Sequence, residues 1–382
     1  MKQIGGNMVS ISERYEPWTL TPYEKWVSDE GLAVHTQQLV PDINTIEVAN
    51  WERTGTKAAL LDLTGEPLDG ALVNNQGTIR FVCDIPPGGS FKLERHMYEE
   101  IFFVVKGRGA TAVWYEGTPK HTFEWQTGSV FSIPLNSWHE IYNASGDETA
   151  RLYGATNAPT AFNLYGSPEF IFDCPMTFPD RFDPNDELYF SGKSTKLEDR
   201  FMETNFIPNV YNVNLDRWTA RGPGANMMIN MANGHFICHL SEFPAGTYKK
   251  AHTSEANRKK AGLVSDVAYL FLSGDGYDLQ WPEGVYPSPG TEWEQLSYKA
   301  GTLMSPGPGY HQHFNCSAEP IRYLVLRYGN PRFAGYVGTR YKETGGPQIQ
   351  FKEEDPAIRL HFEKELASRG AVSHMENYGD EP

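Results

Sequence analysis

The hydrophobic residues of the chain occur mostly in short runs that are rich in β-branched and aromatic side chains and are bounded by Gly, Pro and polar residues. Such runs cover residues 100–105, 110–115, 129–133, 150–155, 267–272 and 322–328. Short strands at fairly even spacing, joined by Gly- and Pro-containing turns, are typical of a β-sandwich or a jelly-roll barrel. The pattern therefore predicts a fold dominated by β-strands.

Two segments carry helical signals instead. Residues 22–28 form one predicted helix, and residues 356–369 form the other. In the second, Asp355 is a suitable N-cap, Pro356 suits the first turn and Gly370 ends the helix. Apolar residues recur along it with the spacing of one helix face, which predicts that this face docks on a barrel. They are Ile358, Phe362 and Leu366.

An internal repeat organises the chain. Aligning Gly88 with Gly246 also aligns Gly107 with Gly274, if a longer loop is inserted at 255–265 in the second copy. With a second, smaller loop insertion between Gly274 and Gly301, the alignment also pairs Gly128, Pro134, His139 and Asn143 with Gly301, Pro306, His311 and Asn315. Self-similarity on this scale predicts two homologous domains.

The repeat sets the predicted domain boundaries. They are an N-terminal extension over 1–75, a first barrel over 76–160, a linker over 161–232, a second barrel over 233–332, and a C-terminal extension over 333–382 that carries the helix. The linker is rich in Pro, Asp, Phe and Asn, so we expect it to wrap around the barrels.

Composition and charge exclude several classes of partner. The 33 Lys and Arg residues against 48 Asp and Glu give a net charge of −15, which disfavours binding to nucleic acid or to an anionic membrane. No segment approaches the ~20 apolar residues of a membrane span, and the first residues lack the apolar core of a signal peptide. The four cysteines form no C-x-x-C pair. We therefore expect a soluble, cytoplasmic protein with buried free thiols.

Two spaced motifs in the first copy carry the candidate chemistry. They read Gly88-x5-Glu94-x-His96-x3-Glu100-x6-Gly107 and Gly128-x5-Pro134-x-Asn136-x2-His139-x3-Asn143. The pair resembles the two sequence motifs of the cupin superfamily, and with the duplication the chain resembles a bicupin. This resemblance implies two jelly-roll barrels with a few peripheral helices. The sequence departs from the family pattern at Glu94, where a histidine is usual, and at Asn136, where a glycine is usual.

The spacing suggests a metal site in the first barrel. Residues four apart on a strand share one face, so His96 and Glu100 point the same way, and His139 from a neighbouring strand completes a cluster. Two imidazoles and one carboxylate suit Fe(II), with Mn, Ni or Zn as alternative divalent ions. Glu94 is either a fourth ligand, a hydrogen-bond acceptor for a ligand N–H, or a general base. The alternative is a barrel whose histidines are hydrogen-bonded core residues.

The second copy keeps fewer of the motif residues. His252 and His311 hold ligand positions, whereas Ser254 and Val267 replace the second histidine and the glutamate. His313 completes a possible second site if its side chain points into the barrel. A structural role, with the pocket degenerate or sealed, is the alternative.

Four aromatic residues flank the first site in the sequence. They are Tyr98, Trp114, Phe131 and Trp138. Those that share the strand face of the ligands are expected to line an aromatic substrate pocket, and ordinary core packing is the alternative. No Gly-rich phosphate-binding motif is present, so no nucleotide cofactor is expected.

Three hypotheses for function follow from the resemblance and the candidate site. The first is an Fe(II) dioxygenase of a small aromatic or organic acid. The second uses the same metal without redox chemistry, in an isomerase, lyase or decarboxylase with Glu94 as the base. The third is a non-catalytic bicupin that binds a small ligand or is structural. The resemblance also implies a homodimer or larger homo-oligomer.

Overall fold

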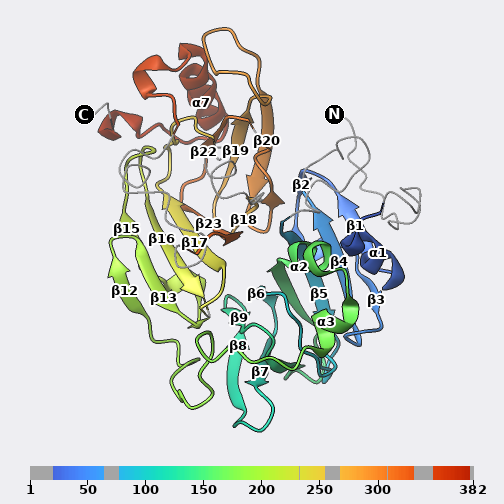
Figure 1. Ribbon diagram of the computed structural model, residues 1–382. Helices are drawn as coiled ribbons and strands as arrows, with labels where there is room; N and C mark the ends of the chain where they lie inside the picture. The colour runs from blue at the N-terminus through green and yellow to red at the C-terminus, as the bar shows by residue number, and fades with distance from the viewer. Residues whose placement is uncertain are drawn as a thin grey trace.

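In the computed structural model of the chain, two β-barrels lie side by side and a few helices cover their outer surfaces (Figure 1). The structure describes residues 20–63, 77–231, 233–253, 267–307, 309–330 and 347–378. The predicted fold, dominated by β-strands in two jelly-roll barrels with peripheral helices, is confirmed. The predicted longer loop at 255–265 lies outside the described residues.

The first barrel consists of a large sheet that faces a three-stranded sheet. The large sheet contains β5 (Ile79–Ile85), β11 (Ala150–Thr156), β6 (Glu100–Lys106) and β9 (Val130–Ile133) as neighbours in this order. The smaller sheet has the order β10 (Trp138–Asn143), β7 (Arg108–Trp114), β8 (His121–Gln126). Gly and Pro turns separate these strands, as the hydrophobic pattern predicts.

The second barrel repeats this topology. Its large sheet has the order β17 (Phe236–Phe243), β23 (Ile321–Tyr328), β18 (Tyr269–Phe271), β21 (Leu303–Met304), and its smaller sheet the order β20 (Glu294–Lys299), β19 (Asp275–Gln280), β22 (His311–Asn315). Asn143 and Asn315 occupy the same place, because the side-chain amide of each donates to three backbone carbonyls. The acceptors are Ile85, Pro86 and Glu148 for the first and Phe243, Pro244 and Glu319 for the second. The internal repeat of the amino-acid sequence is therefore also a repeat of the structure.

The repeat begins earlier in each copy than the sequence indicates. In the first copy β1 (Ala33–Thr36), β3 (Ala49–Trp51) and β4 (Thr56–Asp62) extend the large sheet beyond β5. In the second copy β13 (Phe201–Thr204), β15 (Asp216–Arg217) and β16 (Ala225–Met231) do the same, with β12 (Thr195–Glu198) at the edge. The predicted boundaries at 76 and 233 therefore fall inside the two sheets. These additional strands lack the spaced Gly and Pro residues from which the boundaries were derived.

One short strand from each copy also pairs with the large sheet of the other barrel. β2 (Leu39–Val40) pairs with β21 of the second barrel, and β14 (Phe206–Ile207) pairs with β9 of the first. Within residues 161–232, which the sequence predicts to wrap around the barrels, β14 pairs with the first barrel, and β12, β13, β15 and β16 belong to the sheet of the second. Residues of both large sheets, among them Phe103, Tyr153 and Leu240, form one buried apolar cluster between the barrels.

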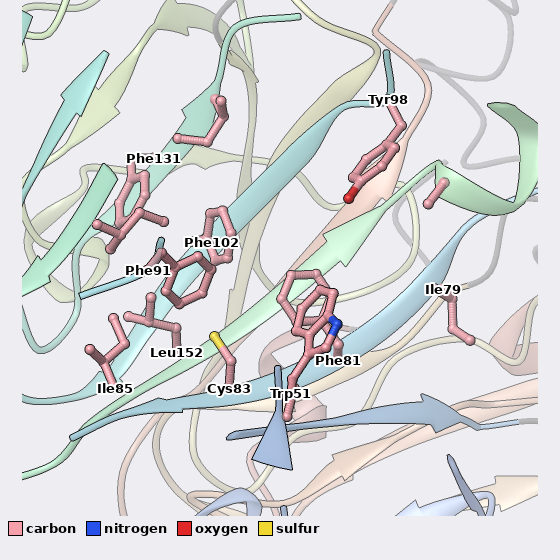
Figure 2. Packing of buried hydrophobic residues seen from close by; sticks show 14 of the residues in the cluster. Trp51, Ile79, Phe81, Cys83, Ile85, Phe91, Tyr98, Phe102, Phe131 and Leu152 are labelled. Atoms are coloured by element: carbon pink, nitrogen blue, oxygen red, sulfur yellow. The ribbon is translucent and has the colours of Figure 1, made fainter. Parts of the chain in front are cut away.

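A second apolar cluster fills the first barrel (Figure 2). Phe102 lies in it in ring contact with Phe81, Phe91 and Phe131, at centroid distances of 5.2–6.4 Å. Aromatic pairs at such distances add to the free energy of area burial. This cluster forms the floor beneath the candidate site.

The helices cover the ends and flanks of the barrels. They are α1 (Pro22–Asp29), α2 (Ala158–Tyr165), α3 (Pro168–Asp173) and α7 (Pro356–Ser368), with 3₁₀ turns η3 (Ile43–Thr45), η6 (Val210–Asn212), η7 (Phe351–Glu353) and η8 (Met375–Tyr378). Both predicted helices are confirmed, and Asp355 caps α7 through the N–H of Ala357. The predicted apolar face of α7 is buried against the second barrel, where Phe362 contacts Tyr248 and Phe314. No helix among the described residues is long and apolar enough to cross a membrane.

Candidate metal centre

The first barrel brings the predicted ligands together. Ligand atoms of His96, Glu100 and His139 all lie within 4.8 Å of one another, and all three side chains are buried. Glu100 begins β6 and His139 lies on β10, whereas His96 lies in the loop before β6 rather than on the strand. Glu100 lies on a strand, as the sequence predicts, whereas His96 does not. The alternation of side chains along a strand therefore does not explain the position of His96.

The ring orientation of both histidines is fixed by backbone carbonyls. Nδ1 of His96 lies 2.8 Å from the carbonyl oxygen of Tyr98, and Nδ1 of His139 lies 3.1 Å from that of Ser137. A carbonyl only accepts, so each Nδ1 carries the proton and each Nε2 presents its lone pair to the site. Histidines that ligate metals are oriented in this way by a partner on the other ring nitrogen.

The site fits a bound cation. Nε2 of His96, Nε2 of His139 and Oε2 of Glu94 are buried and have no hydrogen-bond partner. Nε2 of His96 is 3.3 Å from Oε2 of Glu100, and Nε2 of His139 is 3.9 Å from Oε1 of Glu94. Buried polar atoms without a partner cost free energy, and a divalent ion between them removes that cost.

Glu94 is positioned by backbone pairing with His139. The two residues form an isolated antiparallel bridge, in which the N–H of His139 donates to the carbonyl of Glu94 at 3.0 Å. Its carboxylate thus faces the same space as the three predicted ligands. The three roles predicted for it, as ligand, hydrogen-bond acceptor or base, stay open at this geometry.

Burial controls the charge state of the site. It raises the pKa of Glu94 to about 7, where the nearby His96 acts in the opposite direction, and it raises the pKa of Glu100 to about 7. It lowers the pKa of His139 to about 4 and also lowers the pKa of His96. Without a cation the site therefore prefers neutral carboxyl groups and neutral imidazoles.

A pH dependence of metal binding follows from these shifts. Below about pH 7 an incoming cation displaces protons from Glu94 and Glu100, whereas the imidazoles are already neutral. The affinity of the site for the cation is expected to rise with pH up to about 7 and then to level off. Calorimetry in buffers of different ionisation enthalpy should show more than about one proton released per ion near pH 6 and almost none near pH 8.5. A number of released protons that does not change with pH would contradict the assignment. In Glu94→Gln, about one proton fewer should be released per ion near pH 6.

The four aromatic residues that were candidates for lining a substrate pocket lie in different parts of the first barrel. The Tyr98 ring stacks on His96 at 3.7 Å, so it lies at the site. Phe131 packs in the barrel core against Phe102. Trp114 and Trp138 pair across β7 and β10 and lie beside cations, with Lys120 3.6 Å and Arg95 4.6 Å from the respective rings. Because side chains alternate along β10, an inward His139 places the adjacent Trp138 on the outer face.

A small cavity beside Glu100 contains functional candidates that the sequence did not reveal. It has a volume of about 20 Å³, space for about one water molecule. Its wall includes Tyr23, Trp26, Trp51, Phe81, Tyr98 and Glu100. The Tyr23 hydroxyl and the Trp26 indole N–H are buried without hydrogen-bond partners. Burial, with the Glu100 carboxylate nearby, raises the pKa of Tyr23, so its hydroxyl remains a donor. Both residues belong to α1, for which the sequence predicts a helix but no contact with the site.

The second barrel also brings its predicted residues together. His252, His311 and His313 offer ligand atoms within 4.8 Å of one another, and all three are buried. The condition set by the sequence, an inward His313, is met. Ser254 lies outside the described residues.

The comparison with protein families agrees with this geometry. Residues 81–154 match the family described as Cupin domain. The second barrel has the same strand order and the same asparagine contacts. The first barrel therefore contains a cupin domain, and the chain has the two-barrel fold of a bicupin.

The chain is similar in sequence to plant auxin-binding proteins. It is 27% identical over 136 residues to auxin-binding protein 4 of Zea mays, which covers 34% of this chain and 63% of the maize protein. It is 27% identical over 149 residues to auxin-binding protein T92 of Nicotiana tabacum, covering 37% of this chain and 73% of that protein. The chain thus spans less than two thirds of the length of the maize protein.

Solved structures of oxalate decarboxylases are similar to a large part of the chain. A variant of the Bacillus subtilis enzyme has 12% sequence identity and a TM-score of 0.48, covering 77% of this chain and 78% of that chain. The Lactobacillus farciminis enzyme in complex with formate has 12% identity and a TM-score of 0.47, covering 77% of this chain and 86% of that chain.

Proposed function

We propose that the first barrel holds a divalent metal ion, Fe(II) in preference to Mn, Ni or Zn, through His96, Glu100 and His139. We further propose that the protein is a dioxygenase of a small aromatic or organic acid. The observation that supports it is the cluster of buried ligand atoms on two imidazoles and the Glu100 carboxyl group, in which both Nε2 atoms lack a hydrogen-bond partner. Two histidines and one carboxylate with open positions are the ligand set of non-haem Fe(II) oxygenases.

The residues of the chain have distinct tasks in this proposal. The bound metal would supply Lewis-acid and redox chemistry to a substrate oxygen. The carbonyls of Tyr98 and Ser137 keep both Nε2 atoms deprotonated and directed at the site. Glu94, with a pKa of about 7, exchanges a proton with the substrate through its buried Oε2. The apolar wall of the adjoining cavity leaves space for about one water molecule and excludes bulk water.

Glu94 also favours a second candidate function. A carboxyl group with a pKa of about 7 and a buried oxygen without a partner suits a general base. The same site then serves an isomerase, lyase or decarboxylase, in which no oxygen is consumed.

An oxygen electrode separates the two candidates. Fe(II)-loaded protein is assayed with a panel of small aromatic and organic acids, with and without air. The dioxygenase proposal predicts one O₂ consumed per substrate converted and no conversion without air. Conversion at the same rate without air would contradict it and support the non-redox candidate.

Removing the Tyr23 hydroxyl tests whether α1 takes part in substrate binding. The hydroxyl has no partner within the protein, so Tyr23→Phe should leave stability unchanged but lower kcat/KM about tenfold, the loss of about one hydrogen bond to a substrate oxygen. Tyr277→Phe is the matched control, since Tyr277 has an equally buried hydroxyl without a partner in the second barrel. Equal kcat/KM for both variants would contradict a role for Tyr23.

The remaining hypotheses stay predictions. A non-catalytic bicupin would be recovered folded and free of metal from cells grown with iron. Cytoplasmic location and a homodimer or larger homo-oligomer are expectations from the sequence and the resemblance, which fractionation and light scattering would test.

A further inference from the structure

We infer that the second barrel holds its own divalent ion in a site of three histidines, chemically different from the site in the first barrel. The ligands are His252, His311 and His313, and the ion is of the Zn²⁺ type. This inference is independent of the proposed activity, because it concerns residues on another barrel.

The backbone places the three imidazoles around one point. His252 and His311 exchange two backbone hydrogen bonds, each of 2.9 Å, so they face each other across an antiparallel bridge. His313 follows two residues later on β22 and therefore shares the face of His311. The ring centroids are 4.3 Å apart for His252 and His311, 5.2 Å for His311 and His313, and 5.5 Å for His252 and His313.

Two of the rings are already oriented as metal ligands. Nδ1 of His252 lies 2.8 Å from the carbonyl oxygen of Lys250, and Nδ1 of His313 lies 2.6 Å from Oδ1 of Asp278. Nδ1 of His252 therefore donates to the carbonyl, and with Asp278 in its carboxylate form Nδ1 of His313 donates as well, so that Nε2 of each ring is left as the lone-pair atom. Nε2 of His313 has no hydrogen-bond partner, although the side chain is 0% exposed. A histidine that served only to pack the core would leave this nitrogen unsatisfied.

Asp278 has the position of a residue that orients a ligand. It faces His313 in the register of β19 and β22, and both side chains are completely buried. A carboxylate that accepts from Nδ1 raises the basicity of Nε2 and fixes the ring.

The ligand set predicts the choice of ion and its remaining ligand. Three imidazoles without a carboxylate ligand suit Zn²⁺, whereas the carboxylates in the first barrel are harder ligands. The buried Lys249 ammonium lies in the same barrel, held by the hydroxyls of Ser241 at 2.9 Å and Tyr323 at 3.1 Å. This positive charge favours an anion, such as hydroxide or a carboxylate, as the fourth ligand of the ion.

Zinc stoichiometry tests the inference. The whole protein is stripped with a chelator, dialysed against Zn²⁺, desalted and measured by elemental analysis. We expect two ions per chain for the wild type, one for His313→Ala, one for His96→Ala and none for the double variant. His361→Ala is the matched control, because His361 lies on α7 and bonds Gln295 at the surface. It should retain two ions.

Other outcomes are equally decisive. Folded His313→Ala with the wild-type zinc content would overturn the inference, and so would a wild type with one ion that is lost in His96→Ala. If the wild type holds one ion and His313→Ala loses it, only the metal site proposed for the first barrel is contradicted, and the inference for the second barrel stands. His313→Gln preserves more of the side-chain volume if the alanine variant does not fold.

Asp278→Asn tests the positioning role separately. It should keep the stoichiometry but weaken zinc binding roughly 10- to 100-fold, measured by competition with a chelating dye. Unchanged affinity would contradict the role of Asp278.

Discussion

Replacing His96 with alanine is expected to remove iron from the first barrel and to abolish most turnover. The variant loses the Nε2 atom that faces Glu100 at 3.3 Å. The carboxyl groups that remain have pKa values of about 7, so near neutral pH they hold a cation less well without the imidazole. Loss of a residue that only orients a ligand costs about 10- to 100-fold, and loss of the ligand itself is expected to cost more.

Iron content and turnover of His96→Ala are measured together. Elemental analysis after anaerobic loading should show the iron of the first barrel missing, with circular dichroism unchanged. His374→Ala, which removes an exposed histidine from the C-terminal segment, should leave both values at the wild-type level. Iron retained at the wild-type content in folded His96→Ala would contradict the ligand assignment.

Replacing Glu99 with alanine is expected to lower the free energy of unfolding by about 3–5 kcal/mol. Glu99 is 3% exposed and connects three parts of the chain. Its Oε1 lies 2.5 Å from a guanidinium nitrogen of Arg181 and 2.9 Å from Nδ1 of His235, and its Oε2 accepts from the backbone N–H of His235. Without the carboxylate, the partly buried guanidinium of Arg181 and imidazole of His235 lose this buried partner.

Two controls separate this network from ordinary ion pairs. Glu99→Gln keeps an oxygen acceptor and should cost less than Glu99→Ala. Lys25→Ala breaks an exposed pair with Asp29 and should cost under about 1 kcal/mol. Urea unfolding followed by tryptophan fluorescence gives all three values. A Glu99→Ala midpoint equal to that of Lys25→Ala would contradict the role of the network.

The barrels were predictable because their strands carry a strong local pattern. Short apolar runs between Gly and Pro turns marked β6, β7, β9 and β11 in the first barrel and β18 and β23 in the second, and the repeat supplied the number of barrels. The strands that precede each motif region were missed. β2 and β14 have two residues each and pair with the other barrel, and so short a segment has no period to detect.

One departure from the cupin pattern has a local explanation. Asn136 replaces the usual glycine and has φ of 55°, in the left-handed region that asparagine tolerates better than most residues. Its side-chain amide donates to the carbonyls of Cys174 and Met176, which ties the linker to the barrel. The substitution therefore keeps the turn that the motif needs.

Motif spacing identified the candidate ligands that the structure brings together, but not the surroundings of the site. His96, Glu100 and His139 were found because they belong to the motifs. Trp138 was placed in the pocket by its neighbourhood in the sequence, although a residue next to an inward ligand faces outward. Tyr23 reaches the site only through the docking of α1, a tertiary contact that no local pattern encodes.

Anomalous X-ray scattering at the iron edge tests the central claim most directly. Crystals are grown from protein loaded anaerobically with Fe(II), and the difference map identifies the coordinating atoms. The account predicts a peak in the first barrel bonded to Nε2 of His96, Nε2 of His139 and a carboxylate oxygen of Glu100. A first barrel without a peak in iron-loaded crystals, or a peak bonded to other residues, would contradict it.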